Sequence, residues 1–199
     1  MSLRVIDLFS GAGGLSRGFA DAGFEIVHAN EIDPSFCKTF SENHKNTIVD
    51  NRDITKINIK KDFSLKNKIN LVIGGPPCQG FSQKGNRKGL LDNRNFLFLK
   101  FIEVVKSANP EVFVMENVPN LLTSSNGYFF NEIQDIFEEM GFQIESRILN
   151  AYNYGVPQKR KRAFIVGNRI DKKFQFPNEI KLKVNIKDAI SDLPELKSG

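Results

Sequence analysis

The chain has 199 residues, of which 40% are apolar and 26% charged, with a net charge of +5 and a pI near 9.2. This describes one soluble globular domain, and the basic charge permits a polyanionic partner such as DNA. No apolar run approaches the roughly 20 residues of a membrane span, and no signal-peptide layout opens the sequence. Cys37 and Cys78 are far apart, so we expect no disulfide framework, no metal site and a reducing, cytoplasmic setting.

Apolar runs bounded by turn residues predict seven strands. We expect them at 3–9, 25–30, 47–49, 69–73, 112–115, 142–149 and 163–166. Apolar residues recurring at helical spacing predict helices between and after these strands. We expect them at 15–22, 34–43, 95–107, 129–140 and 186–193. The lysine- and asparagine-rich stretch 56–68 is predicted to be a surface connection.

Strands that alternate with helices at this spacing predict an α/β fold with a doubly wound, mostly parallel sheet. Right-handed crossovers would bring the loops after residues 9, 30, 50, 73 and 115 to one rim of that sheet. Ligands of such sheets bind at the carboxyl ends of the strands. We therefore expect the functional residues to lie in these loops.

A glycine loop at 10–14 follows the first predicted strand and precedes a helix. Gly11 and Gly13 permit positive φ and close approach to a ligand, and a helix N-terminus offers free N–H groups to an anion. Ser16 stands where G-x-G-x-x-G has its third glycine, which disfavours an NAD pyrophosphate site. Glu31, 20 residues after Gly11, ends the second predicted strand, where an acid binds ribose hydroxyls.

Asp53 follows the third predicted strand and has two equally weighted interpretations. It can accept from an adenine amino group, or it can cap a helix that begins at Ile54-Thr55. Together, the three loops predict a cofactor with a nucleoside part and a group suited to a helix N-terminus. S-adenosylmethionine (SAM) fits, since it has an adenine, a ribose and a carboxylate.

The stretch 74–83, Gly-Gly-Pro-Pro-Cys-Gln-Gly-Phe-Ser-Gln, holds Cys78 in a rigid loop after the fourth predicted strand. From these residues alone, two interpretations of Cys78 are equally weighted: an exposed nucleophile, or a small buried hydrophobic residue in a tight turn. The stretch 158–162 places four cations in five residues, and by itself such a run is typical of a solvated turn.

Several motifs occur in a set order along the chain. They are Asp-Leu-Phe-Ser-Gly-Ala-Gly-Gly from Asp7, the acids Glu31 and Asp53, Pro-Pro-Cys-Gln around Cys78, Glu-Asn-Val from Glu116, and Gln-x-Arg-x-Arg ending at Arg162. In this order the chain closely resembles the DNA (cytosine-5) methyltransferases up to about Gly167. The resemblance implies a SAM-dependent, Rossmann-like methyltransferase fold. It further implies a SAM-binding catalytic domain at 1–167, with 168–199 as the lead-in to a target-recognition domain.

The resemblance also implies roles in catalysis. Cys78 attacks C6 of a cytosine flipped out of duplex DNA, so that C5 becomes nucleophilic and takes a methyl group from SAM. Glu116 holds N3 and the exocyclic amine of the base, while Arg160 and Arg162 support the base and the catalytic loop. Because they alternate, these arginines point to one face if their segment is extended. The stretch 82–94 is expected to close behind the base.

A set of cofactor contacts follows from the same loops and the same resemblance. They are Phe9, Gly11, Gly13, Leu15, Glu31, Ile32, Asp53, Ile54, Pro77, Asn95 and Leu97.

The motifs that follow the lead-in in the family are not found in these residues. A truncated gene, one subunit of a split enzyme and a degenerate remnant all remain open, and we expect the chain alone to be weak or inactive. The expected partners are double-stranded DNA, a second chain with the target-recognition domain if the enzyme is split, and a cognate restriction endonuclease. A tRNA cytosine-5 methyltransferase and a non-catalytic SAM- or DNA-binding subunit are the competing interpretations.

Overall fold

A computed structural model describes residues 2–63, 68–77, 96–180 and 184–194. Cys78, the stretch 82–94 and Asn95 therefore lie outside the described residues. Seven strands form one sheet. They are β1 (Arg4–Leu8), β2 (Glu25–Asn30), β3 (Ile48–Asp50), β4 (Leu71–Gly74), β5 (Val112–Asn117), β6 (Gln143–Asn150) and β7 (Lys161–Asn168).

The strand order is β3-β2-β1-β4-β5-β7-β6. The pairs among β1 to β5 are parallel, whereas β7 runs antiparallel to both β5 and β6. The order reverses between β1 and β4, and such a switch point opens a crevice at the carboxyl ends of the strands. The predicted doubly wound, mostly parallel sheet is confirmed, and the loops after β1 to β5 share one rim.

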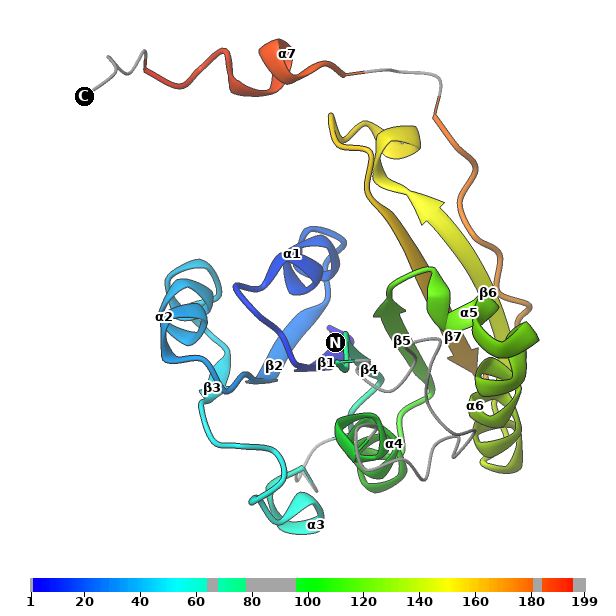
Figure 1. The fold of residues 1–199 in the computed structure, drawn as a ribbon. Coiled ribbons are helices and arrows are strands. Elements are labelled where there is room, and N and C mark those ends of the chain that lie inside the picture. The colour runs from blue at the N-terminus through cyan, green and yellow to red at the C-terminus, as the bar shows by residue number, and fades with distance from the viewer. Residues whose placement is uncertain (1, 64–67, 78–95, 181–183, 195–199) are drawn as a thin grey trace.

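Helices cover both faces of the sheet (Figure 1). They are α1 (Gly14–Asp21), α2 (Pro34–Asn43), α3 (Ile59–Asp62), α4 (Phe96–Ala108), α5 (Asn120–Thr123), α6 (Tyr128–Glu139) and α7 (Ile186–Ile190), with 3-10 turns at Ser124–Gly127 and Ala151–Tyr154. Helices α1 and α2 lie on one face, and α3, α4 and α6 lie on the other (Figure 1). Pro34 begins α2 at its first turn, and the Asp33 carboxylate caps it by accepting the N–H of Ser35.

Each face of the sheet has its own hydrophobic core. Under α4 and α6, the fully buried Phe113 of β5 packs against Phe137 with 4.0 Å between ring centroids and against Phe101 at 6.1 Å. Under α1 and α2, a smaller core surrounds Phe40, which is also fully buried. These cores hold the parallel strands rigidly beneath the rim.

The stretch 56–68 differs from its prediction as a surface connection. Ile57 and Ile59 are buried, and Phe63 is fully buried in the larger core. Ile59 is the first residue of the short helix α3, whose N-terminus is capped by the Asn58 side chain. Three apolar residues among lysines and asparagines are too few to show a helical period, so neither the helix nor its burial was predicted.

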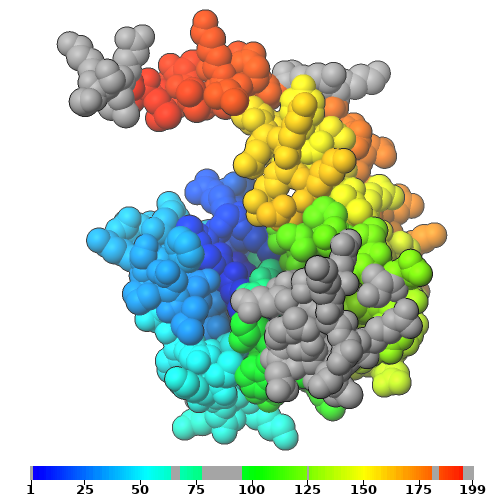
Figure 2. All heavy atoms as spheres, viewed as in Figure 1, coloured from blue at the N-terminus to red at the C-terminus, as the bar shows by residue number. Residues whose placement is uncertain are grey.

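Residues after β7 run along the outer side of β6, in orange in Figure 1, before α7 at the edge of the molecule (Figure 2). The Arg147 guanidinium lies 4.9 Å from the ring centroid of Phe176, and the Tyr154 hydroxyl donates to the carbonyl of Pro177. None of the described helices combines the length and apolar character that a membrane crossing requires.

His28 in β2 makes stability depend on pH. Neither ring nitrogen has a hydrogen-bond partner among the described residues, and burial lowers the pKa of His28 despite the Asp50 carboxylate 3.8 Å away. The unfolded chain therefore takes up a proton below about pH 6.5 before the folded chain does, so stability should fall as pH drops through that range. The buried Asp7 carboxyl, whose pKa is raised to about 7, acts in the opposite direction over the same range, so the His28 effect is measured as a difference between two chains. Relative to the unaltered chain, His28→Phe should gain stability in urea unfolding as pH is lowered from 8 to 5. A constant difference between the two chains would contradict this account.

Candidate active site

The ends of three neighbouring strands bring the predicted motifs together. Leu8 of β1 pairs with Gly74 of β4, which pairs with Met115 of β5, so the residues that follow each of them are level at the rim. Gly74 permits this approach, since a Cβ there would lie 2.4 Å from the Leu8 carbonyl oxygen. Phe9, Gly75 and Glu116 consequently line one cavity.

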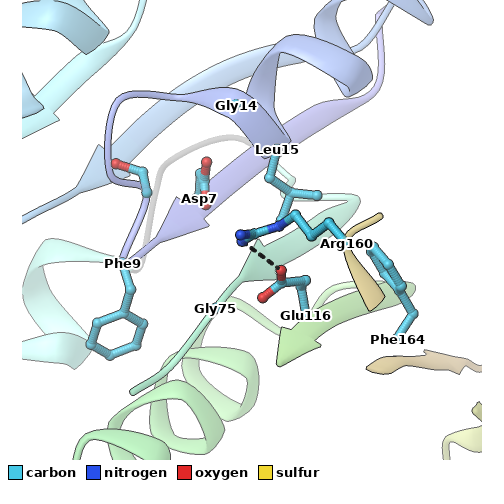
Figure 3. Close-up of a pocket in the computed structure, with 9 residues that line it drawn as sticks. Asp7, Phe9, Gly14, Leu15, Gly75, Glu116, Arg160 and Phe164 are labelled. Atoms are coloured by element: carbon cyan, nitrogen blue, oxygen red, sulfur yellow. Dashed lines mark ion pairs between the residues drawn. The ribbon is translucent and has the colours of Figure 1, made fainter. Parts of the chain in front are cut away.

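This cavity has a volume of about 430 Å³, within the range of small-molecule sites. It is lined by Asp7, Phe9, Ser10, Gly14, Leu15, Gly75, Glu116, Arg160 and Phe164 (Figure 3). Phe9 and Leu15 come from the predicted cofactor set, and Glu116 and Arg160 from the predicted catalytic set. The structure thus places parts of both sets around one space.

Glu116 and the two predicted arginines form an ion-pair cluster. The Glu116 carboxylate oxygen Oε1 lies 3.0 Å from Nε of Arg162 and 3.6 Å from a terminal nitrogen of Arg160 (Figure 3). Antiparallel pairing places Glu116 opposite Phe164 in β7, and Arg162 lies two residues before Phe164 on the same face. The prediction that both arginines point to one face is confirmed.

A smaller cavity of about 220 Å³ adjoins this cluster. Pro76, Pro77, Glu116, Arg160 and Arg162 are among its lining residues. A carboxylate that accepts, two guanidiniums that donate and a proline wall can bind a planar polar ring. Pro77, a predicted cofactor contact, therefore lies beside the cluster of Glu116, Arg160 and Arg162 and directly precedes Cys78 in the sequence.

Asn117 anchors the Pro-Pro turn, a role that the sequence motif did not indicate. Its buried amide donates to the carbonyl of Pro76 at 2.8 Å, while its side-chain oxygen accepts the N–H of Val118. The middle residue of Glu-Asn-Val thus connects β5 to the residues that lead into the Cys78 loop.

The glycine loop adopts the backbone that its composition predicts. Phe9, Gly11 and Gly13 have φ values of 56°, 54° and 92°, all in the left-handed region. A Cβ at Gly13 would also lie 2.8 Å from Nε2 of His44, so both conformation and space favour glycine there. Gly13 is the N-cap of α1, and Gly14 and Leu15 of the first turn line the cavity.

Glu31 is tied directly to this loop. One carboxylate oxygen accepts the N–H of Gly11 at 2.8 Å, and the other accepts the N–H of Asp33 at 2.9 Å. Both oxygens retain free lone pairs, which can accept from the hydroxyls of a ribose. The sequence spacing of Gly11 and Glu31 thus corresponds to a contact in space.

The other predicted cofactor residues occupy varied environments. Ile32 is 63% exposed, Leu97 is half-buried against the larger core, and Ile54 is 3% exposed within that core. The Asp53 carboxylate accepts the N–H of Thr55, and this hydrogen bond lowers the pKa of Asp53. Residues 54–56 form a turn and not a helix, so Asp53 caps a turn, and contacts of these four residues with a cofactor stay predictions.

Asp7 and Ser16 form a buried pair that sequence reasoning missed. The Ser16 hydroxyl donates to the Asp7 carboxylate at 2.6 Å, and both residues are almost fully buried. Burial raises the pKa of Asp7 to about 7, the Ser16 hydrogen bond opposes this, and the charge of Glu31 adds to it. The signal available in the sequence was one aspartate within an otherwise apolar strand. Ser16 was interpreted only as the residue that replaces the third glycine of G-x-G-x-x-G.

Ser10 supplies a second polar group to the cavity. Its hydroxyl oxygen is buried and has no hydrogen-bond partner among the described residues. Buried polar groups are normally paired, so the unpaired Ser10 hydroxyl is a candidate partner for a polar group of a ligand in this cavity. Together, Ser10, Glu31, Asp7 and the N-terminus of α1 fit a cofactor with a carboxylate, ribose hydroxyls and cationic groups, as SAM has.

Comparison with known proteins agrees with this geometry. The chain is 42% identical to the Type II methyltransferase M1.HphI of Haemophilus parahaemolyticus, covering 100% of this chain and 55% of that protein. It is 40% identical to the Type II methyltransferase M.AquIA of Picosynechococcus, covering 98% of this chain and 90% of that protein. The chain thus spans little more than half of the first relative and nearly all of the second.

Solved structures share the fold. A protein described as a DNA modification methyltransferase encoded within an E. coli prophage superposes with a TM-score of 0.82 at 34% identity, covering 98% of this chain and 56% of that one. DNMT2 of Spodoptera frugiperda superposes with a TM-score of 0.69 at 26% identity, covering 88% and 52%. The sheet, with its glycine loop and rim acid, therefore has the Rossmann-like fold of SAM-dependent methyltransferases.

The model of the family described as C-5 cytosine-specific DNA methylase matches residues 3–198. The chain belongs to this family.

Proposed function

We propose that this chain carries the catalytic machinery that transfers a methyl group from SAM to C5 of a cytosine flipped out of double-stranded DNA. The observation that carries the proposal is the Glu116–Arg162–Arg160 cluster, which faces both the cofactor cavity and the Pro76–Pro77 turn before Cys78. A glutamate and two arginines beside the prolines that directly precede a cysteine favour chemistry on a bound ring over binding alone.

Residues of the glycine loop and of β2 would hold the cofactor. Glu31 accepts from the ribose hydroxyls, the N-terminus of α1 and the Ser10 hydroxyl bind the carboxylate, and Asp7 balances positive charge. When bound, SAM supplies an electrophilic methyl group. Phe9 and Leu15 give the cavity its apolar contacts.

The side chains at the base pocket activate the ring. The Cys78 thiolate forms a bond to C6, and the electron pair of the C5–C6 double bond becomes available at C5 to take the methyl group. The Glu116 carboxyl donates its proton to N3 as charge builds on the ring, and its other oxygen accepts from the exocyclic amine, while Arg160 and Arg162 hold Glu116 and the base in place. Loss of the C5 proton and expulsion of the thiolate then restore the double bond and the free cysteine.

A trapping experiment tests the proposal. The 199-residue chain is incubated with SAM and duplex DNA containing 5-fluorocytosine, whose C5 fluorine cannot leave as a proton does. We expect a denaturant-resistant protein–DNA adduct that Cys78→Ser abolishes, with Cys37→Ser as the matched control that retains it. In parallel, calorimetry measures binding of S-adenosylhomocysteine to the same chain.

Each outcome bears on one part of the proposal. Cofactor binding without an adduct would show that this chain does not perform the chemistry alone, as expected of a non-catalytic subunit or of one subunit of a split enzyme. An adduct on 5-fluorocytosine tRNA but not on DNA would favour the tRNA enzyme. An adduct that persists in Cys78→Ser would show that the assigned nucleophile is wrong. Lack of cofactor binding would overturn the assigned cavity.

A further inference from the structure

The loops after β2 and β3 are joined by the side chain of Asn51. Its amide nitrogen lies 3.1 Å from the carbonyl oxygen of Glu31, 3.0 Å from that of Ile32 and 3.3 Å from Sγ of Cys37. The Cys37 thiol itself donates to the same Glu31 carbonyl at 3.1 Å. One amide and one thiol therefore converge on the backbone that carries the predicted ribose-binding acid.

The other polar groups of Glu31 already have partners. Its N–H donates to the carbonyl of Asp50 at 3.1 Å, and its carboxylate accepts from the N–H groups of Gly11 and Asp33. The carbonyl is the remaining polar group, and Asn51 and Cys37 hold it. Rotation of the Glu31 peptide, which would swing the carboxylate away from Gly11, is thereby resisted.

Asn51 is not required to keep the strands together. The buried amide of Asn30 donates to the carbonyls of Asp50 and Arg52, and the backbone pairing of β2 with β3 lies below both loops. Asn51 is exposed and belongs to neither hydrophobic core. Its contacts are therefore concentrated on the loop that carries Glu31, where orientation decides ligand affinity.

We propose that Asn51 is a positioning residue for the nucleoside end of the cofactor, acting through Glu31. This inference rests on the proposed function, because it assumes that Glu31 binds a ribose. Asn51→Asp has nearly the same shape but replaces two N–H donors with an oxygen facing two carbonyl oxygens. The altered loop should present Glu31 less favourably.

The expected result is a Kd for S-adenosylhomocysteine about 10-fold higher in Asn51→Asp, the loss expected for one well-placed hydrogen bond. An analogue without the two ribose hydroxyls should bind the variant and the unaltered chain equally, because Glu31 has nothing to accept from it. Glu31→Gln should weaken S-adenosylhomocysteine binding too, and adding Asn51→Asp to it should cost little more.

Asn43→Asp is the matched control. Its amide also donates to a backbone carbonyl, that of Thr39 at 3.0 Å, but on the exposed side of α2. Affinity should not change in this variant. Thermal unfolding should show similar midpoints for all the asparagine variants, which separates positioning from folding.

The outcomes separate this inference from the proposed function. If the unaltered chain binds no S-adenosylhomocysteine, both are overturned. If it binds and Asn51→Asp binds as tightly, only the role of Asn51 is overturned. An equal loss for the analogue without ribose hydroxyls would also overturn it, since the effect would not pass through Glu31.

Discussion

Replacing Glu116 with glutamine should slow methyl transfer to duplex DNA by about 100- to 10,000-fold, the range typical of a lost group in acid–base catalysis. The amide keeps the shape of the side chain but loses the negative charge that Arg162, at 3.0 Å, and Arg160, at 3.6 Å, both face. It would also direct an N–H group toward donors of the base or of the arginines. The ring would then lose the partner that stabilises it as electron density shifts toward C5.

The single-turnover rate with tritiated SAM measures this effect, and the Kd of S-adenosylhomocysteine serves as a second readout. The Kd should change little, because Glu116 acts on the base and not on the cofactor in the proposed mechanism. Glu103→Gln is a suitable control, since Glu103 pairs with Lys100 at 2.7 Å on α4, away from both cavities. A rate for Glu116→Gln within about threefold of the unaltered chain would remove Glu116 from the proposed chemistry.

Asp7→Asn should stabilise the fold at pH 8 while weakening cofactor binding. Burial raises the pKa of Asp7 from 3.8 in the unfolded chain to about 7 in the folded one. Between these values the unfolded chain releases its proton while the folded chain keeps it, so stability falls as pH rises. Above pH 7 the cost is constant and on the order of 4 kcal/mol.

The asparagine variant removes this cost and can still accept the Ser16 hydroxyl. In urea unfolding, Asp7→Asn and the unaltered chain should therefore be equally stable at pH 4. At pH 8 the variant should be more stable by a few kcal/mol. The variant should bind S-adenosylhomocysteine more weakly, because the cavity loses an acid that balances the ammonium group.

Asp21→Asn provides the control, since Asp21 is exposed and pairs only with Arg17 on α1 among its described contacts. Its stability should be nearly unchanged at both pH values. If Asp7→Asn showed no pH-dependent gain, the buried carboxyl would not be the source of the cost. A gain in stability without loss of binding would separate Asp7 from the cofactor.

The sequence by itself determined the fold class and the order of the motifs. Alternating apolar runs and glycine breaks are local signals, so β2 and α2 were predicted with the bounds that the structure has. The alternation of Arg160 and Arg162 also led to a correct expectation, because it depends only on the geometry of an extended segment. The spacing of Gly11 and Glu31 corresponds to a hydrogen bond between them, whereas the expected contact of Glu31 with a ribose stays a prediction.

Only the tertiary structure decided which groups meet and in what environment. The level ends of β1, β4 and β5 place Asp7, Ser10 and Glu116 around one cavity, and antiparallel β7 delivers the arginines to it. Local pattern could not reveal that Ser16 satisfies Asp7 or that Asn51 holds the Glu31 loop, because these partners are 9 and 20 residues apart. Burial and hydrogen bonding across such separations arise from packing, and they set the pKa of Asp7 and the orientation of Glu31.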